Sequence, residues 1–131
     1  VAIEEAINYA KSKYKNVIVI LGAGGDRDKR KRKKMGEAAT SADHIIITND
    51  NPRHEDPIDI SKGILEGIPL NKNTDVILDR KEAIYKGVES LKENEVLLIL
   101  GKGHEKFQEV ENNLLPFDDI KIAREALELR S

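Results

Sequence analysis

The stretch Asn16–Gly22, NVIVILG, is a continuous run of branched apolar residues that ends at a glycine. Runs of the same kind recur at His44–Thr48 (HIIIT) and at Glu95–Gly101 (EVLLILG). Strands that are apolar on both faces are typical of parallel sheets covered by helices on both sides. These runs therefore predict buried, parallel strands in an α/β domain.

Helical patterns separate these strands, because apolar residues recur with charged residues between them. Helices are expected at Val1–Lys13, through Met35 to about Ala42, at Pro57–Ile68, at Arg80–Glu93 and at Asp118–Leu129, the last with Asp118 as its N-cap. A short strand is expected at Asp75–Asp79, and Phe107–Phe117 is expected to form an antiparallel ribbon with Asn112–Asn113 at its tip. The alternation predicts a doubly wound, mostly parallel β-sheet flanked by helices, with a short antiparallel edge.

The composition limits the possible classes of protein. The chain has 131 residues, of which 35% are charged and 39% apolar, which suits one folded domain over residues 1–131. The formal net charge of −2 argues against a general nucleic-acid partner, which needs a basic excess. Cysteine is absent, and no apolar run reaches membrane-span length, so neither a disulfide framework nor a membrane partner is expected. Because the chain begins at Val1, we expect an excised piece or a processed chain.

Each long apolar run continues directly into a polar loop. These loops are GAGGDRD (Gly22–Asp28), DNPRHEDP (Asp50–Pro57) and GKGHE (Gly101–Glu105). In open α/β sheets, ligands bind beyond the carboxyl ends of the strands, where the loops of parallel neighbours meet. The side chains expected there are those of Asp26, Arg27, Asp28, Asp50, Asn51, Arg53 and Glu105.

This set of side chains suits a small zwitterion. Arginine recognises carboxylates with two parallel hydrogen bonds, and Glu105 or Asp50 would accept an ammonium group. Asn51 both donates and accepts, and Pro52 fixes a backbone angle that would aim Arg53. Surface ion pairs and simple glycine turns are the alternative explanation for any one loop. Several such loops at equivalent strand ends favour a binding site.

Several sharper motifs are incomplete. A dinucleotide fingerprint would need glycine at Arg27, and neither glycine turn supplies the Gly-Lys-Ser/Thr of a phosphate-binding loop. Position Gln108 breaks a His-Glu-x-x-His zinc motif. The histidines lie in separate segments and no cysteine accompanies them, so no metal site is expected. No nucleophile triad is apparent.

The basic run Lys29–Lys34, KRKRKK, has two interpretations. Such a run is usually the solvated face of a helix rather than a nucleic-acid patch. Its position beside the glycine turn leaves open a second role, which is extra positive potential for an anionic substrate.

The polar segments together resemble a known family. GAGGDRDKRKRKKM (Gly22–Met35), TNDNPRHEDP (Thr48–Pro57) and GKGHEKFQ (Gly101–Gln108), in this order, look like the signature segments of the C-terminal domain of the UDP-N-acetylmuramoyl-tripeptide synthetases, in the Mur ligase family. The resemblance runs over nearly the whole chain and implies a Rossmann-like fold. The basic run Arg30–Lys34 departs from the pattern, since relatives often carry proline or glycine there.

The resemblance implies a part of a cytoplasmic bacterial enzyme that makes peptidoglycan precursors. In that family an N-terminal domain binds the UDP-sugar, and a central domain binds ATP and Mg²⁺. The C-terminal domain brings the amino acid that is added to UDP-MurNAc-L-Ala-D-Glu. The chain resembles this last domain alone. It is therefore expected to need no cofactor, to hold no catalytic residue or metal ligand, and to be inactive in isolation.

The resemblance also assigns roles to individual residues. The positions that match the family's substrate-binding residues are Arg27, Asp50, Asn51, Pro52, Arg53, Gly101 and Glu105. Arg53 would clamp the distal carboxylate of meso-diaminopimelate, with Asn51 beside it, and Arg27 would reach a substrate carboxylate as well. Gly101 and Glu105 would hold the distal ammonium through a carbonyl and a carboxylate.

Alternatives remain at the level of substrate and of protein class. Arg53 favours diaminopimelate over lysine, because lysine-adding members resemble this pattern less at that position. Meso-lanthionine has the same head groups and stays open. Other possibilities are a related folylpolyglutamate-type or archaeal pseudomurein ligase, and a free-standing amino-acid-binding module without catalysis.

Overall fold

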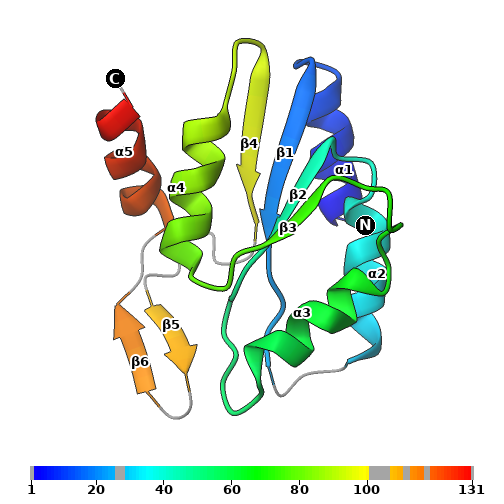
Figure 1. Cartoon of the computed structure of the whole chain (residues 1–131), viewed down its shortest axis with the longest axis vertical. Helices are drawn as coiled ribbons and strands as arrows, with labels where there is room; N and C mark the ends of the chain where they lie inside the picture. Colours follow the sequence, from blue (N-terminus) through cyan, green and yellow to red (C-terminus); the bar gives the residue numbers. More distant parts are fainter. Residues whose placement is uncertain (1, 26–28, 101–106, 111–112, 117–118, 131) are drawn as a thin grey trace.

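A parallel sheet forms the centre of the molecule (Figure 1). The computed structural model describes residues 2–25, 29–100, 107–110, 113–116 and 119–130. The four strands lie in the order β3-β2-β1-β4. They are β1 (Asn16–Leu21), β2 (His44–Ile47), β3 (Thr74–Val76) and β4 (Glu95–Ile99). All neighbouring pairs are parallel, with Ile20 in register with Ile46 on one side and Ile99 on the other, so the predicted parallel sheet is confirmed.

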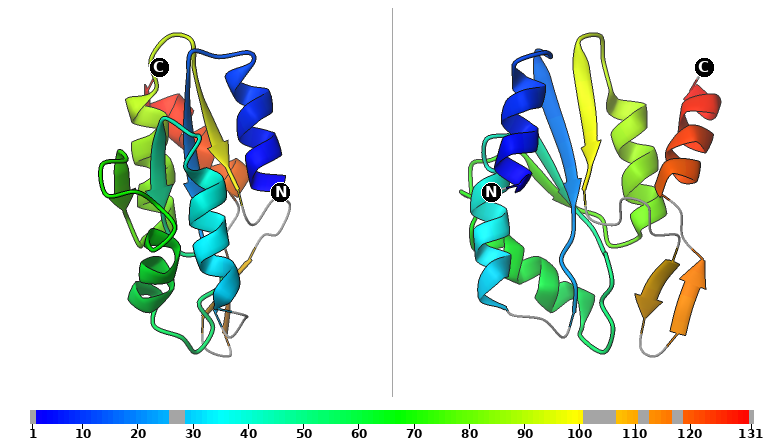
Figure 2. Two further views of the ribbon diagram at one scale, coloured as in Figure 1. Left: turned by 90° about the vertical axis from the view of Figure 1, so that its right-hand side faces the viewer. Right: turned by 180° about the vertical axis from the view of Figure 1, so that it is seen from behind.

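Helices cover both faces of this sheet, as the doubly wound prediction requires (Figure 2). One face is covered by α1 (Ala2–Lys11), α2 (Arg30–Ala39) and α3 (Pro57–Leu65), and the other by α4 (Arg80–Ser90) and α5 (Asp119–Arg130). Successive residues of a strand point to opposite faces. Val17 and Val19 of β1 therefore pack in the core beneath α1–α3, whereas Ile18 and Ile20 pack beneath α4 and α5.

Several elements are shorter than the patterns predicted, for local reasons. The strand expected at Asp75–Asp79 ends at Val76. Asp79 instead caps α4, because its carboxylate accepts hydrogen bonds from the backbone N–H groups of Lys81 and Glu82. The helix expected to reach Ala42 ends at Ala39.

The starts of two further helices were predicted, one near Pro57 and one at Asp118. Helix α3 begins at Pro57 as expected, capped by Asp56, whose carboxylate accepts from the Ile58 N–H at 2.9 Å. The predicted capping by Asp118 lies outside the described residues.

The predicted antiparallel ribbon is present. Strands β5 (Phe107–Val110) and β6 (Asn113–Pro116) pair antiparallel. Within the described residues they form a separate two-stranded sheet, which Figure 1 places beyond the carboxyl ends of the main strands, rather than an edge of the main sheet. Asn112, expected at the tip, is outside the described residues.

Helix α2 approaches helix α3 and the turn that follows it closely, through glycines. A Cβ on Gly36 would lie 2.1 Å from the Ile64 carbonyl oxygen, and a Cβ on Gly67 would lie 2.0 Å from that of Lys33. Any side chain at these positions would force the helices apart. This contact matters for function because α2 follows the glycine turn after β1 and α3 follows the loop after β2.

Candidate functional site

The loops that follow β1 and β2 are in direct backbone contact. The Gly25 N–H donates to the Asn51 carbonyl at 2.6 Å. A Cβ on Gly25 would lie 1.8 Å from the Pro52 carbonyl oxygen, and one on Gly22 would lie 2.5 Å from that of Thr48. The glycines of the turn are therefore required by the close approach of the second loop. The prediction that these loops meet at one edge of the sheet is confirmed for the described residues.

Arg53 lies at this junction in an unusual backbone conformation. Its φ of 54° is in the left-handed region, which residues other than glycine adopt uncommonly. Its Nη1 donates to the carbonyls of Gly25 at 3.0 Å and Asn51 at 3.3 Å. Backbone strain of this kind persists where the surrounding structure imposes it, often in ligand clamps. The two bonds fix the orientation of a half-buried cation at the meeting point of the loops.

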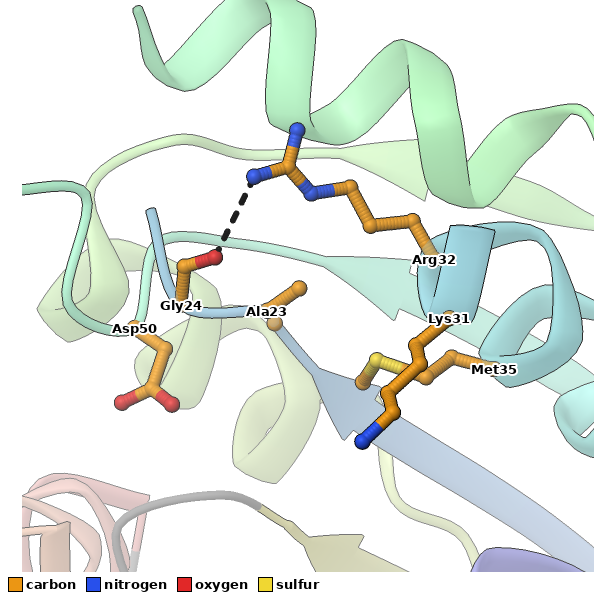
Figure 3. Close-up of a pocket in the computed structure, with 7 residues that line it drawn as sticks. Ala23, Gly24, Lys31, Arg32, Met35 and Asp50 are labelled. Carbon is orange, nitrogen blue, oxygen red and sulfur yellow. Dashed lines mark hydrogen bonds between the residues drawn. The ribbon is translucent and has the colours of Figure 1, made fainter. Parts of the chain in front are cut away.

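An ion pair between a buried arginine and a half-buried glutamate ties helix α2 to the same loop. Arg32 is 3% exposed, and its Nη1 and Nη2 donate to the two carboxylate oxygens of Glu55 at 2.5 and 2.8 Å. Nη2 also donates to the Gly24 carbonyl at 3.3 Å (Figure 3). Arg32 thus joins α2, the glycine turn and the segment just after Arg53. Its aliphatic stem packs against Gly63 of α3.

We expect Glu55→Gln to loosen this connection without unfolding the domain. The amide keeps one acceptor for Arg32 but removes the charge, and a hydrogen bond to a charged group contributes about 1.5–3 kcal/mol. The free energy of unfolding should therefore fall by about 2 kcal/mol, and Glu66→Gln on the exposed end of α3 should change it little. Denaturant unfolding measures both, and equal stability of the two variants would contradict the role given to the pair.

A hollow opens beside the glycine turn. Its volume is about 520 Å³, within the usual range for small-molecule sites. It is lined by Gly22, Ala23, Gly24, Lys31, Arg32, Met35 and Asp50. In Figure 3 the Lys31 and Asp50 side chains extend to the same side of the turn, away from the Arg32 guanidinium. A cation and an anion at one hollow are complementary to a zwitterionic ligand.

The residues predicted from the sequence fall into two groups. Asp50, Asn51, Pro52 and Arg53 follow β2 and lie against the glycine turn, with Asp50 lining the hollow. Arg27, Gly101 and Glu105 lie outside the described residues. The substrate roles of all seven stay predictions.

The opposite edge of the sheet carries a second, more open hollow. Its lining includes Asn16, Asp43, His44 and Glu95, at or next to the amino ends of the strands. A hydrogen bond from the Asn16 side chain, followed by one from the Lys92 backbone N–H, lowers the pKa of Glu95 below its ordinary value. Ligands of open α/β sheets bind at the other edge, so we assign the site to the carboxyl ends.

The described residues contain no group of three or more His, Asp or Glu side chains placed to hold a metal ion. None of the helices in the described part of the chain combines the length and apolar character needed to cross a bilayer.

The sequence patterns did not single out Arg32 and Glu55 as residues of this site. The basic run Lys29–Lys34 was interpreted as a solvated face, and this is correct for its exposed lysines but wrong for Arg32. The run also contains Arg30, which is exposed, so no pattern in the sequence distinguishes the buried arginine from the exposed one.

Comparisons with known proteins find relatives over most of the chain. Residues 1–103 match the family described as Mur ligase, glutamate ligase domain. A UDP-N-acetylmuramoyl-L-alanyl-D-glutamate–2,6-diaminopimelate ligase of Prochlorococcus marinus (strain NATL1A) is 49% identical over 118 residues, covering 89% of this chain and 23% of the relative. The enzyme of the same name from Rickettsia felis is 46% identical over 134 residues, covering 96% of this chain and 25% of the relative.

A solved structure of a ligase of that name superposes with a TM-score of 0.94 at 35% identity, covering 98% of this chain and 27% of that one. The chain thus spans only about a quarter of the length of these relatives. The resemblance drawn from the loop motifs is confirmed at the level of family and fold. With the family model matching residues 1–103 of 131, the chain belongs to the Mur ligase family, as its glutamate ligase domain.

Proposed function

We propose that residues 1–131 are the amino-acid-binding, C-terminal domain of an ATP-dependent ligase that adds meso-diaminopimelate to UDP-MurNAc-L-Ala-D-Glu. The reaction would form an amide bond in a peptidoglycan precursor, in the bacterial cytoplasm. The other substrate, the UDP-MurNAc-dipeptide, would be bound by domains outside this chain.

One observation carries the proposal. The Asp50–Arg53 loop is fastened to the glycine turn at the carboxyl edge of the sheet, and Arg53 is held there by two backbone carbonyls. A guanidinium of fixed orientation is what two-point recognition of a carboxylate needs. Further support comes from the names of the relatives, which specify 2,6-diaminopimelate as the amino acid.

The proposed site distinguishes diaminopimelate by its second amino-acid head group. Arg53 binds the distal carboxylate, Asn51 lies beside it, and Arg27 contacts a substrate carboxylate. Gly101 and Glu105 accept the distal ammonium. A site built to pair with a polar group rejects analogues that lack it, because its own groups are then left unpaired. Lysine lacks the distal carboxylate and should therefore be a poor substrate.

ATP and Mg²⁺ belong to the part of the enzyme outside this chain in this proposal. This chain's part in the reaction is to bind and orient the amino acid.

The test is ligation by the full-length protein that contains this domain. With ATP, Mg²⁺ and UDP-MurNAc-L-Ala-D-Glu, we expect product with meso-diaminopimelate and a kcat/KM for lysine lower by at least about 100-fold. Residues 1–131 alone should form no product. The same assay with meso-lanthionine, which has the same two head groups, tests whether the site also distinguishes the linker between them. Equal use of lysine, or turnover by the isolated chain, would contradict the proposal.

A further inference from the structure

A second buried arginine, Arg80, connects segments that the proposed site depends on. Arg80 is the first residue of α4 and is 1% exposed. Its Nε and Nη2 donate to the two carboxylate oxygens of Asp119, both at 2.7 Å. Asp119 is the first residue of α5 and is 3% exposed. The pair is a two-point contact between the beginnings of the two helices on this face, which lie side by side in Figures 1 and 2.

The same guanidinium also binds the ends of two strands. Nη1 donates to the Asn49 carbonyl at 3.0 Å, and Nη2 donates to the Leu100 carbonyl at 3.2 Å. Asn49 lies just beyond β2 and Leu100 just beyond β4. Strands β2 and β4 are not neighbours, because β1 lies between them. Arg80 therefore links the ends of two strands that have β1 between them.

The strand ends that Arg80 binds lie at the point where the winding of the sheet reverses. From β1 the chain proceeds through α2 to β2 on one side, whereas β4, on the other side, is reached through α4 on the opposite face. The crevice at such a reversal is the place where open α/β sheets bind ligands. The Asp50–Arg53 loop starts directly after Asn49. Arg80 therefore holds the backbone from which this loop departs.

We infer that Arg80 is a positioning residue for the amino-acid site, and that Asp119 holds its guanidinium in place. The inference rests on the proposed function. Arg80 fixes the separation between the carboxyl ends of β2 and β4, and so fixes where the Asp50–Arg53 loop stands across the crevice. A clamp for a zwitterion needs this separation to be constant. Asp119 is required because a buried guanidinium without its counter-ion is strongly destabilising.

The experiment compares Arg80→Lys with wild type in the full-length ligase. Lysine keeps the charge but cannot bond Asp119, Asn49 and Leu100 in the planar geometry of arginine. We expect the KM for meso-diaminopimelate to rise by about 10-fold or more, since small displacements of positioning groups have large kinetic effects. The KM values for ATP and for the UDP-MurNAc-dipeptide should stay within about 3-fold. Arg124→Lys, at an exposed position of α5, is the matched control and should change none of them.

A double variant separates positioning from mere stabilisation. Arg80→Met with Asp119→Leu replaces the ion pair by apolar side chains, which often preserves stability. It leaves the Asn49 and Leu100 carbonyls without their donor, so we expect thermal stability near that of wild type and a KM for meso-diaminopimelate that stays raised. If the double variant has both the thermal stability and the KM for meso-diaminopimelate of the wild type, the inference is overturned. So would an unchanged KM in Arg80→Lys, or KM values that rise equally for all substrates.

A milder variant covers the case in which the Arg80 variants do not fold. Asp119→Asn keeps Arg80 but weakens its anchor, and it should raise the KM for meso-diaminopimelate selectively, by about 3-fold or more. An unchanged KM in this folded variant would overturn the inference. If the wild-type enzyme adds another amino acid, the proposed function fails, and the same KM comparison is then made with that amino acid.

Discussion

Arg53→Ala in the full-length ligase is expected to lower kcat/KM for meso-diaminopimelate by at least about 100-fold. In the proposed site the guanidinium makes a paired, partly desolvated contact with the distal carboxylate. Removing one partner of a buried pair costs about 3–5 kcal/mol, and each ~1.4 kcal/mol corresponds to a factor of ten. Lysine has no distal carboxylate, so its use should fall far less. Steady-state ligation with both amino acids in parallel measures the difference.

The backbone of Arg53 calls for additional variants. Alanine at a φ of 54° would be strained, and it would also release the carbonyls of Gly25 and Asn51. Arg53→Asn tolerates the left-handed conformation but removes the charge, so it should lose diaminopimelate use as Arg53→Ala does. Arg53→Lys should rescue activity only in part, because an ammonium group cannot form the planar fork.

The control for these variants is Glu4→Ala, at an exposed position of α1. It should leave kcat/KM unchanged for both amino acids. If Arg53→Ala reduces the use of diaminopimelate and lysine by the same factor, Arg53 acts on the loop alone and the carboxylate clamp is wrongly assigned.

Gly25→Ala is expected to separate the two loops of the site. Its Cβ would lie 1.8 Å from the Pro52 carbonyl oxygen, a backbone atom that cannot rotate away. The hydrogen bond from the Gly25 N–H to Asn51 would break as the loops part. We expect the free energy of unfolding to fall by at least about 3 kcal/mol. Because Arg53 is anchored on Gly25, kcat/KM for diaminopimelate should fall by at least about 100-fold as well.

Gly87→Ala is the matched control for this substitution. Its Cβ would meet the ends of side chains rather than backbone atoms, with Leu97 Cδ1 at 3.0 Å and Ile20 Cδ1 at 3.1 Å. Gly87 lies in helix α4, where alanine is favoured over glycine by about 0.5–1 kcal/mol. Denaturant unfolding and ligation assays should therefore show little change. If Gly25→Ala behaves like Gly87→Ala, the loops are not held together as described.

The architecture followed from the sequence because local patterns carry it. The apolar runs at β1, β2 and β4 predicted strands covered on both faces, and the alternation with helices predicted a parallel, doubly wound sheet. Element ends were less well predicted. Strand β3 stops at Val76 because Asp79 caps the next helix. The periodicity of apolar residues does not indicate whether Asp79 ends a strand or caps a helix.

The amino-acid sequence by itself determined that the loops after β1 and β2 meet, since the carboxyl ends of parallel strands share an edge. Only the tertiary structure decided how these loops are fastened. Arg32 and Arg80 are buried against carboxylates 23 and 39 residues away in the chain, Glu55 and Asp119. The left-handed Arg53 is bonded to Gly25, 28 residues away. A charged residue in a sequence is indistinguishable from a solvated one until its partner is placed beside it, because burial of a charge requires that partner.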